Sequence, residues 1–327
     1  MITLMPSDKP TICQQNLIER KYGMFIHFGI NTFNDTEWSN GKLPVSSYNP
    51  QSIDAESWVK NAYNAGMNYV IIITKHHDGF CLWDTDTTDY CVNRSPNKTD
   101  VIAEVAKACK KYNIKLGLYY SLWDRHEKCY KNDEQYVEYM CKHLTELLGG
   151  KYGEICELWL DGGWDKRPKK WNIPKIYDLA HSLQPDCATA VNLTIGYPWS
   201  KKASKKFHPQ NYKEGMPMKY FPSDFRLWDP NFTRADDPKL YEYKGNTYYL
   251  PFEATICIRN MSNWFWDPKY KDDKLMDADF IIDKYKLLTS ASNALVVNVA
   301  PDIYGKQDPD DIKILMQVAE KLGIARK

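Results

Sequence analysis

The sequence repeats one pattern, a short apolar run followed by a polar loop and an amphipathic helix, roughly every 40 to 50 residues over its first five units. Short apolar runs that end in glycine or polar residues are typical of buried strands in a parallel sheet. The strands expected from this pattern are 21–29, 69–74, 115–120, 155–160, 188–193, 247–256 and 294–299. The alternation predicts an α/β fold, a (β/α)8 TIM-like barrel with some distorted strands and distorted or missing helices.

A chain of 327 residues can form one such barrel, so we expect a single catalytic domain over 1–327. Residues 1–19 are polar and are expected to form an N-terminal arm. The region 197–246 loses the repeat and is rich in Lys, Pro, Tyr and Asp, which predicts long irregular loops that carry function. The last helix is expected to end near Leu322, which leaves no room for a C-terminal β-sandwich.

Charge and cysteine usage narrow the expected partners and location of the protein. The net charge is +1 with acids and bases interspersed, which gives no basis for binding nucleic acid or an anionic membrane. No stretch has the roughly 18 apolar residues of a membrane span, and residues 1–16 lack the apolar core of a signal peptide. Nine scattered cysteines without a CxxC pair favour a reducing compartment, so we predict a cytoplasmic protein.

Asp161 is the first candidate catalytic residue. It comes directly after the apolar run 155–160 and precedes two glycines and Trp164. Chemistry in parallel α/β folds occurs at the C-terminal ends of the strands. A carboxylate at this position suits catalysis, although an Asp-Gly pair is also a common turn that could cap the next helix.

Polar and aromatic residues recur at the other predicted strand ends. They are His27, His76, His77, Tyr119, Trp123, Asn192 and Glu253. Because strand ends converge on one face of a barrel, we expect these side chains to share one pocket with Asp161. A neutral imidazole offers both a donor and an acceptor to sugar hydroxyls. The eleven Trp and 23 Tyr also fit sugar-stacking surfaces, so the group indicates a carbohydrate site.

Sequence motifs for other chemistries are absent. Adjacent residues in a strand point to opposite sides, so His76 and His77 would rarely bind one metal ion. The sequence has no HExxH or HxH pattern, no cysteine ligand spacing, no glycine-rich phosphate loop and no GxSxG motif. We therefore expect no metal and no cofactor. Of the chemistries considered, this leaves carboxylate chemistry such as glycoside hydrolysis, which uses two carboxyl groups.

Several motifs together resemble the α-L-fucosidase family, glycoside hydrolase family 29, over most of 20–196 and the final quarter of the chain. The matching segments are His27-Phe28-Gly29, Asn31-Thr32-Phe33, Glu37-Trp38, Tyr48-Asn49-Pro50, Lys75-His76-His77-Asp78-Gly79-Phe80, Leu118-Tyr119-Tyr120-Ser121, Leu158-Trp159-Leu160-Asp161-Gly162 and 292–301.

This resemblance implies a retaining exo-glycosidase that releases terminal α-L-fucose through a covalent glycosyl–Asp intermediate. The family's nucleophile falls on Asp161. The expected substrate-binding residues are His27, Glu37, Trp38, His76, His77 and Tyr119, joined by the aromatic residues Trp123 and Trp264. The implied partner is a fucosylated oligosaccharide or glycoconjugate.

The second carboxyl group stays open between two residues. Glu253 is favoured because Glu is the usual acid and because it is expected at the end of a strand. It also resembles a Glu that, in one branch of the family, orients the substrate instead. Asp224 in the irregular region is the alternative, and a turn Asp paired to Arg226 is its competing interpretation. The partner's carboxyl group should lie about 5–5.5 Å from that of Asp161.

Other functions compete with the fucosidase. An α-L-galactosidase of the same family would need a polar partner near C6, where we expect Trp38, Trp264 and Trp266. A non-catalytic sugar-binding barrel should have lost Asp161, and a metal-dependent sugar isomerase or hydrolase should lose activity on chelation. Without a β-sandwich, the open site is expected to accept branched glycans or to be completed by a partner subunit in a homo-oligomer.

Overall fold

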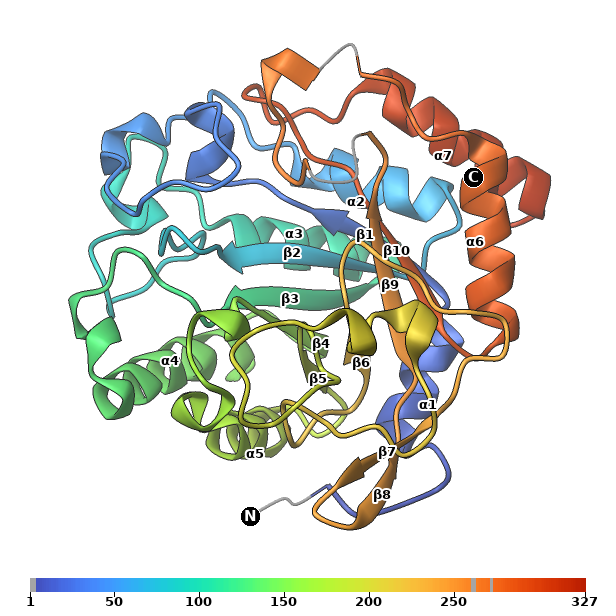
Figure 1. Cartoon of the computed structure of the whole chain (residues 1–327). Helices are drawn as coiled ribbons and strands as arrows, with labels where there is room; N and C mark the ends of the chain where they lie inside the picture. The colour runs from blue at the N-terminus through green and yellow to red at the C-terminus, as the bar shows by residue number, and fades with distance from the viewer. Residues whose placement is uncertain (1–3, 260–262, 271–272) are drawn as a thin grey trace.

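The computed structural model describes residues 4–259, 263–270 and 273–327. In this part of the chain, eight strands form one sheet in the order β5-β4-β3-β2-β1-β10-β9-β6, and every neighbouring pair is parallel (Figure 1). These strands are β1 (Tyr22–Ile26), β2 (Tyr69–Lys75), β3 (Lys115–Ser121), β4 (Ile155–Asp161), β5 (Ala188–Val191), β6 (Arg226–Leu227), β9 (Phe252–Cys257) and β10 (Ala294–Asn298). The predicted (β/α)8 TIM-like barrel is confirmed.

The two end strands, β5 and β6, close the barrel through loop and side-chain hydrogen bonds. The amides of Leu193 and Thr194 donate to the carbonyl of Leu227 at 3.1 and 3.3 Å. The Asp224 amide donates to the Thr189 carbonyl at 2.9 Å, and the Asp224 carboxylate accepts the Thr189 amide at 2.8 Å. Individual hydrogen bonds therefore replace a regular strand ladder between β5 and β6, and we call this junction the seam of the barrel.

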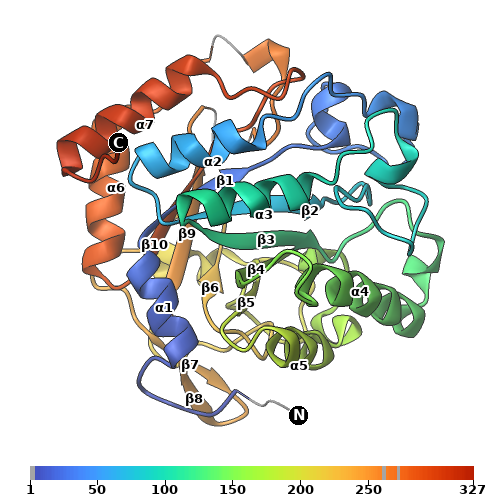
Figure 2. The ribbon, with the colours of Figure 1, turned by 180° about the vertical axis from the view of Figure 1, so that it is seen from behind.

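The helices lie on the outside of the sheet (Figure 2). They are α1 (Ile12–Arg20), α2 (Ala55–Asn64), α3 (Val101–Tyr112), α4 (Asp133–Leu148), α5 (Ile173–Leu183), α6 (Ala278–Ser290) and α7 (Pro309–Leu322). Side chains of Asp54, Asp100, Asn132, Asp277 and Asp308 accept backbone amides where α2, α3, α4, α6 and α7 begin, as favourable N-caps do. None of the described helices combines the length and apolar character needed to cross a bilayer.

Two connecting helices of a regular barrel are missing from the described chain, as the irregular region 197–246 predicted. Long loops join β5 to β6, and the antiparallel hairpin of β7 (Leu240–Tyr243) and β8 (Asn246–Tyr249) lies between β6 and β9. The expected strand 247–256 is therefore two strands, β8 and β9, which belong to different sheets. Pro251 stands between them and cannot donate to a strand ladder.

The segment expected to be an N-terminal arm is a helix from Ile12 onward. A capping box between Thr11 and Gln14 begins α1, and Leu17 is fully buried on its inner face. The helix packs against β5 and β10, so residues 12–20 belong to the barrel.

Three aromatic residues fill the barrel interior below the strand ends. Phe25, Tyr119 and Trp159 come from β1, β3 and β4 and are almost completely buried. Their ring centroids lie 5.5 to 5.8 Å apart. This packed layer forms a rigid floor for the pocket above it.

Candidate active site

A narrow pocket opens at the C-terminal ends of the barrel strands. It is lined by Phe25, His27, Trp38, His76, His77, Tyr119, Trp159, Asp161, Trp164, Asp229 and Trp264. Most of the residues that the sequence predicted for the site are therefore brought together, from segments far apart in the chain. Two carboxyl groups, Asp161 and Asp229, face this one aromatic pocket.

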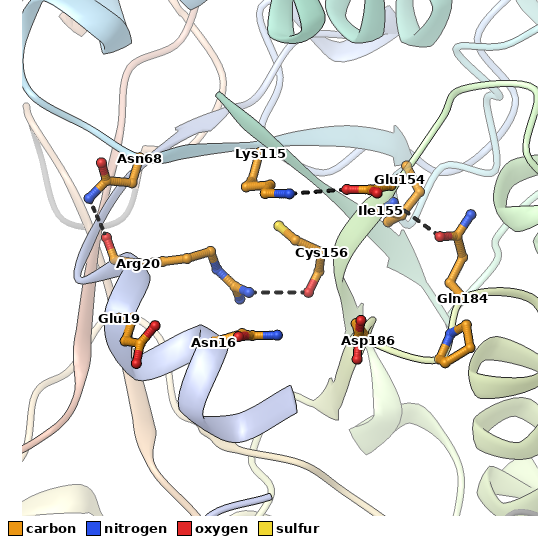
Figure 3. A pocket seen from close by; sticks show the side chains of 11 residues that line it. Asn16, Glu19, Arg20, Asn68, Lys115, Glu154, Ile155, Cys156, Gln184 and Asp186 are labelled. Carbon is orange, nitrogen blue, oxygen red and sulfur yellow. Dashed lines mark hydrogen bonds and ion pairs between the residues drawn. The ribbon is translucent and has the colours of Figure 1, made fainter. Parts of the chain in front are cut away.

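A wider groove of about 470 Å³ lies near the other ends of β3 and β4 (Figure 3). Two of its cationic groups already have partners. Lys115 pairs with Glu154 at 3.0 Å, and Arg20 donates to the carbonyl of Cys156 at 3.3 Å. Since the paired carboxyl groups lie at the opposite end of the barrel, we assign the chemistry to the narrower pocket.

Asp161 is the last residue of β4 and is buried. Its carboxylate accepts hydrogen bonds from the Tyr119 hydroxyl at 2.8 Å and from the Asn192 amide at 3.0 Å. Burial raises the pKa of Asp161 to about 6, while these two donors oppose the shift. Gly162 has φ +71°, and a Cβ there would lie 2.6 Å from the Cβ of Trp123, so only glycine fits the turn after Asp161.

The pocket histidines are neutral. Burial lowers the pKa of His27 and of His77 to about 3 and that of His76 well below its usual value. His27 Nδ1 lies 2.7 Å from the side-chain oxygen of Asn298, and His77 Nδ1 lies 2.6 Å from the Ser121 hydroxyl. Asn298 Oδ1 is an acceptor, and Ser121 donates its own proton to a carbonyl, so each Nδ1 carries the hydrogen. Both rings thus keep an unprotonated Nε2, and that of His77 lies 3.6 Å from a carboxylate oxygen of Asp161.

His76 and His77 do not obey the alternation expected for a strand. β2 ends at Lys75, so both histidines lie beyond it and both line the pocket, with ring centroids 4.2 Å apart. The argument that they point to opposite sides is therefore wrong. Across the described residues, no group of three or more His, Cys, Asp or Glu side chains is arranged to hold a metal ion.

Asp229 is the second carboxyl group of the pocket, and sequence reasoning missed it. It follows β6 by two residues. The Asn192 side-chain amide donates to Asp161 and also contacts the Asp229 carboxylate. Burial, and then the negative charge of Asp161, raise the pKa of Asp229 to about 7. The two-residue strand β6 is too short to produce a detectable pattern in the sequence.

Glu253 lies at the opposite end of the barrel from Asp161, so its expected position at a strand end is wrong. It is the second residue of β9 and pairs in register with Ala294, the first residue of β10. The hydroxyl of Tyr69, the first residue of β2, donates to its carboxyl group at 2.7 Å. This position does not fit the predicted acid/base.

Glu253 instead forms a buried carboxyl pair with Glu157. The Arg20 guanidinium holds Glu157 at 2.6 Å, and the two carboxyl groups share a hydrogen bond. Burial, followed by the charge of Glu157, raises the pKa of Glu253 well above its usual value. Glu253 therefore keeps the proton, while Glu157 stays charged against Arg20.

Glu253→Gln is expected to keep most of the activity and to change how stability depends on pH. Wild-type Glu253 binds a proton in the folded state that the unfolded chain releases above about pH 4.3, so this group makes wild type less stable as pH rises. Glutamine keeps a donor for Glu157 and an acceptor for Tyr69 but cannot titrate. Urea unfolding at pH 5 and pH 8 should show the variant gaining stability relative to wild type, by at most about 1.4 kcal/mol per pH unit. Large loss of activity without loss of stability would contradict this assignment.

Asp224 is also outside the pocket. Its buried carboxylate accepts the Tyr177 hydroxyl at 2.6 Å, His181 Nε2 at 2.9 Å and the Thr189 amide. The expected turn pairing to Arg226 is wrong as well, because Arg226 pairs with Asp237 at 2.6 Å. Asp224 joins β5 to β6 at the seam of the barrel, which is a structural task.

The remaining predicted residues support the pocket wall. Glu37 accepts the amides of Trp264 and Phe265 at 3.1 and 3.2 Å, and burial raises its pKa to about 7. The half-exposed ring of Trp38 meets those of His77 and Trp123 edge-on at 5.2 and 5.7 Å. Glu37 and Trp123 thus contact lining residues without themselves lining the pocket. Trp266, expected near C6 of the sugar, is likewise not a lining residue.

The chain is similar in sequence and in fold to known proteins. The model of the alpha-L-fucosidase family matches residues 44–325. Alpha-L-fucosidase 1 of Arabidopsis thaliana is 35% identical over 305 residues, which cover 91% of this chain and 57% of that protein. Tissue alpha-L-fucosidase of Bos taurus is 26% identical over 221 residues, 57% of this chain and 46% of that protein. The crystal structure of a glycoside hydrolase 29 family member from an unknown rumen bacterium superposes with a TM-score of 0.75 and 26% identity, covering 96% of this chain and 57% of that one.

Proposed function

The chain belongs to the alpha-L-fucosidase family, and from this premise we propose that it is a retaining exo-α-L-fucosidase acting on fucosylated glycans. It spans less than three-fifths of the length of the plant relative, so the activity is argued from its own site. One observation supports the proposal above the others: a single amide, that of Asn192, contacts both Asp161 and Asp229.

In the proposed first step, the Asp161 carboxylate attacks the anomeric carbon while Asp229 protonates the glycosidic oxygen. The carbon–oxygen bond breaks, the leaving group departs with the Asp229 proton, and fucose stays covalently bound to Asp161. In the second step, Asp229 removes a proton from water, which attacks the same carbon and frees both fucose and Asp161. Their raised pKa values suit these roles, because Asp229 holds its proton more tightly than Asp161 does.

The spacing of the carboxyl groups supports retention. Two hydrogen bonds to one nitrogen keep the contacting oxygens of Asp161 and Asp229 within about 6 Å of each other. Retaining enzymes place their carboxyl groups about 5–5.5 Å apart, whereas inverting enzymes need about 6.5–9.5 Å to admit a water.

The pocket wall supports a 6-deoxy sugar. The free Nε2 atom of His27 can accept a sugar hydroxyl, and the buried Nε1 of Trp159 has no other partner among the described residues. Aromatic rings, including Phe25 and Trp264, offer an apolar surface to the methyl group of fucose. The 6-hydroxyl of L-galactose would lose hydrogen bonds to water against such a wall.

The test is hydrolysis of 4-nitrophenyl α-L-fucoside, α-L-fucosyl fluoride and 4-nitrophenyl α-L-galactoside by the purified chain, with and without a chelator. We expect both fucosides to be cleaved faster than the galactoside, with no effect of chelation. Binding of fucose without turnover of either fucoside would favour the sugar-binding barrel instead.

Because the nine cysteines are all free, we also propose a reducing, cytoplasmic location.

Activity is expected to follow a narrow bell-shaped pH profile with its optimum between about pH 6 and pH 7. On the acidic side kcat/KM falls as Asp161 gains a proton and stops being a nucleophile. On the alkaline side it falls as Asp229 loses the proton it must donate. Since the two groups titrate together, the apparent values belong to the pair. The measurement is the pH dependence of kcat/KM on fucosyl fluoride and on a glycan. Because fluoride leaves with little acid assistance, the profile on fucosyl fluoride should lack most of the alkaline decrease.

A further inference from the structure

Two aromatic rings outside the pocket have no part in the mechanism above. Trp199 is 68% exposed, and its ring stacks on that of Tyr197 with centroids 5.0 Å apart and an angle of 23°. Tyr197 meets the buried ring of Phe207 edge-on at 4.8 Å. One face of Trp199 thus rests on an anchored ring, while most of its surface faces solvent.

The loop that carries these rings borders the pocket. Lys201, two residues after Trp199, lies 4.0 Å from the carboxylate of Asp165. Asp165 directly follows Trp164, which lines the pocket. The contact between Lys201 and Asp165 therefore brings the loop that carries Trp199 beside the segment that carries Trp164. The loop also follows β5, whose C-terminal end faces the same side of the barrel as Asp161.

The loop is held in a fixed shape. The Ser200 amide donates to the carbonyl of Tyr197 at 3.0 Å and closes a turn around Trp199. The ammonium group of Lys219, a buried residue, donates to the carbonyl of Lys201 at 3.1 Å. A surface that is ordered before a ligand arrives loses little conformational entropy on binding.

We propose that Trp199, supported by Tyr197, binds a sugar ring of the leaving group, the part of the glycan that remains after fucose is removed. This inference rests on the proposed function. The terminal fucose fills the narrow pocket above Asp161, so the rest of the glycan passes over the rim. The apolar face of a pyranose fits flat on an indole, much as ring stacking holds bases.

The test compares Trp199→Ala with wild type on substrates that do or do not carry a sugar leaving group. The glycans are 2′-fucosyllactose, 3-fucosyllactose and a fucosylated xyloglucan oligosaccharide, and the reference is α-L-fucosyl fluoride, whose leaving group has no ring. We expect kcat/KM on the glycans that wild type cleaves to fall by about 10-fold, and kcat/KM on the fluoride to stay unchanged. Trp199→Phe, which keeps an aromatic face, should recover most of the loss.

Tyr304→Ala is the matched control, because Tyr304 is also an exposed aromatic residue, at 53%, but follows β10. It should change neither rate. Equal rates for Trp199→Ala and wild type on the glycans, or an equal loss on the fluoride, would overturn the inference and leave the proposed function intact. Cleavage of the fluoride but of none of the glycans would overturn the inference and the proposed glycan substrate, and would leave only the fucosidase activity. If wild type cleaves neither kind of substrate, the proposed function fails and this inference fails with it.

Discussion

Asp161→Ala is expected to lower kcat/KM on 4-nitrophenyl α-L-fucoside by at least about 10⁴-fold, because it removes the group that forms the covalent intermediate. Its carboxylate ends β4 and is held by Tyr119 and Asn192. Removing it leaves those donors without their acceptor but leaves the strand intact. The folded state should therefore persist, as circular dichroism and thermal unfolding would show.

Trapping provides an independent measurement of the same assignment. Incubation of wild type with 2-deoxy-2-fluoro-α-L-fucosyl fluoride should add one fluorofucosyl group, found by mass spectrometry on the peptide that contains Asp161. The control is Asp224→Asn, which alters a carboxylate at the seam of the barrel and should still be labelled. A label on another carboxylate, or near-wild-type activity of Asp161→Ala, would show that the nucleophile is a different residue.

Asp229→Ala is expected to lower kcat/KM by about 10²- to 10⁴-fold on glycans, whose leaving groups need protonation. The loss on fucosyl fluoride should be much smaller, because fluoride leaves without an acid. On fucosyl fluoride, which forms the glycosyl-enzyme without an acid, azide should restore turnover of the variant by attacking that intermediate, and the product should be the α-fucosyl azide, with its configuration retained. Glu253→Gln and Asp224→Asn should show no rescue.

Glu37 is the other candidate for the acid/base role, because burial raises its pKa to about 7 as well. One of its oxygens accepts two backbone amides, and the other has no partner in the described structure. These bonds position Trp264, which lines the pocket, whereas Glu37 itself does not line it. We expect Glu37→Gln to lose activity without azide rescue. Rescue of Glu37→Gln but not of Asp229→Ala would move the acid/base role to Glu37.

The sequence predicted the parts of the site that follow long, apolar strands. Asp161 ends such a strand and His27 directly follows one, and a fully buried strand has a strong pattern and a clear end. Asp229 follows a strand of two residues, which has no pattern. Its position depends on contacts across the seam, and no local sequence feature encodes those.

The Glu253 error arose from the boundary of a single strand. When 247–256 is taken as one strand, Glu253 falls near its end, but the break at Pro251 makes it the second residue of β9. A shift of a few residues in a strand boundary thus moves a side chain from the catalytic end of a barrel to the other end. Asp224 shows a second difficulty. An Asp that closes the barrel and an Asp that donates a proton are the same residue type, so the sequence alone does not distinguish the two roles.

The seam between β5 and β6 has an evolutionary consequence. The proposed nucleophile lies on a continuous ladder of strands, where a change of register would disrupt the whole barrel. The proposed acid lies across the seam, where a few separate hydrogen bonds hold β6. Insertions and deletions in the loops beside β6 can change the sequence position of the proton donor, while the nucleophile stays at the end of β4. The barrel architecture therefore constrains the position of Asp161, whereas the position of Asp229 is free to change during evolution.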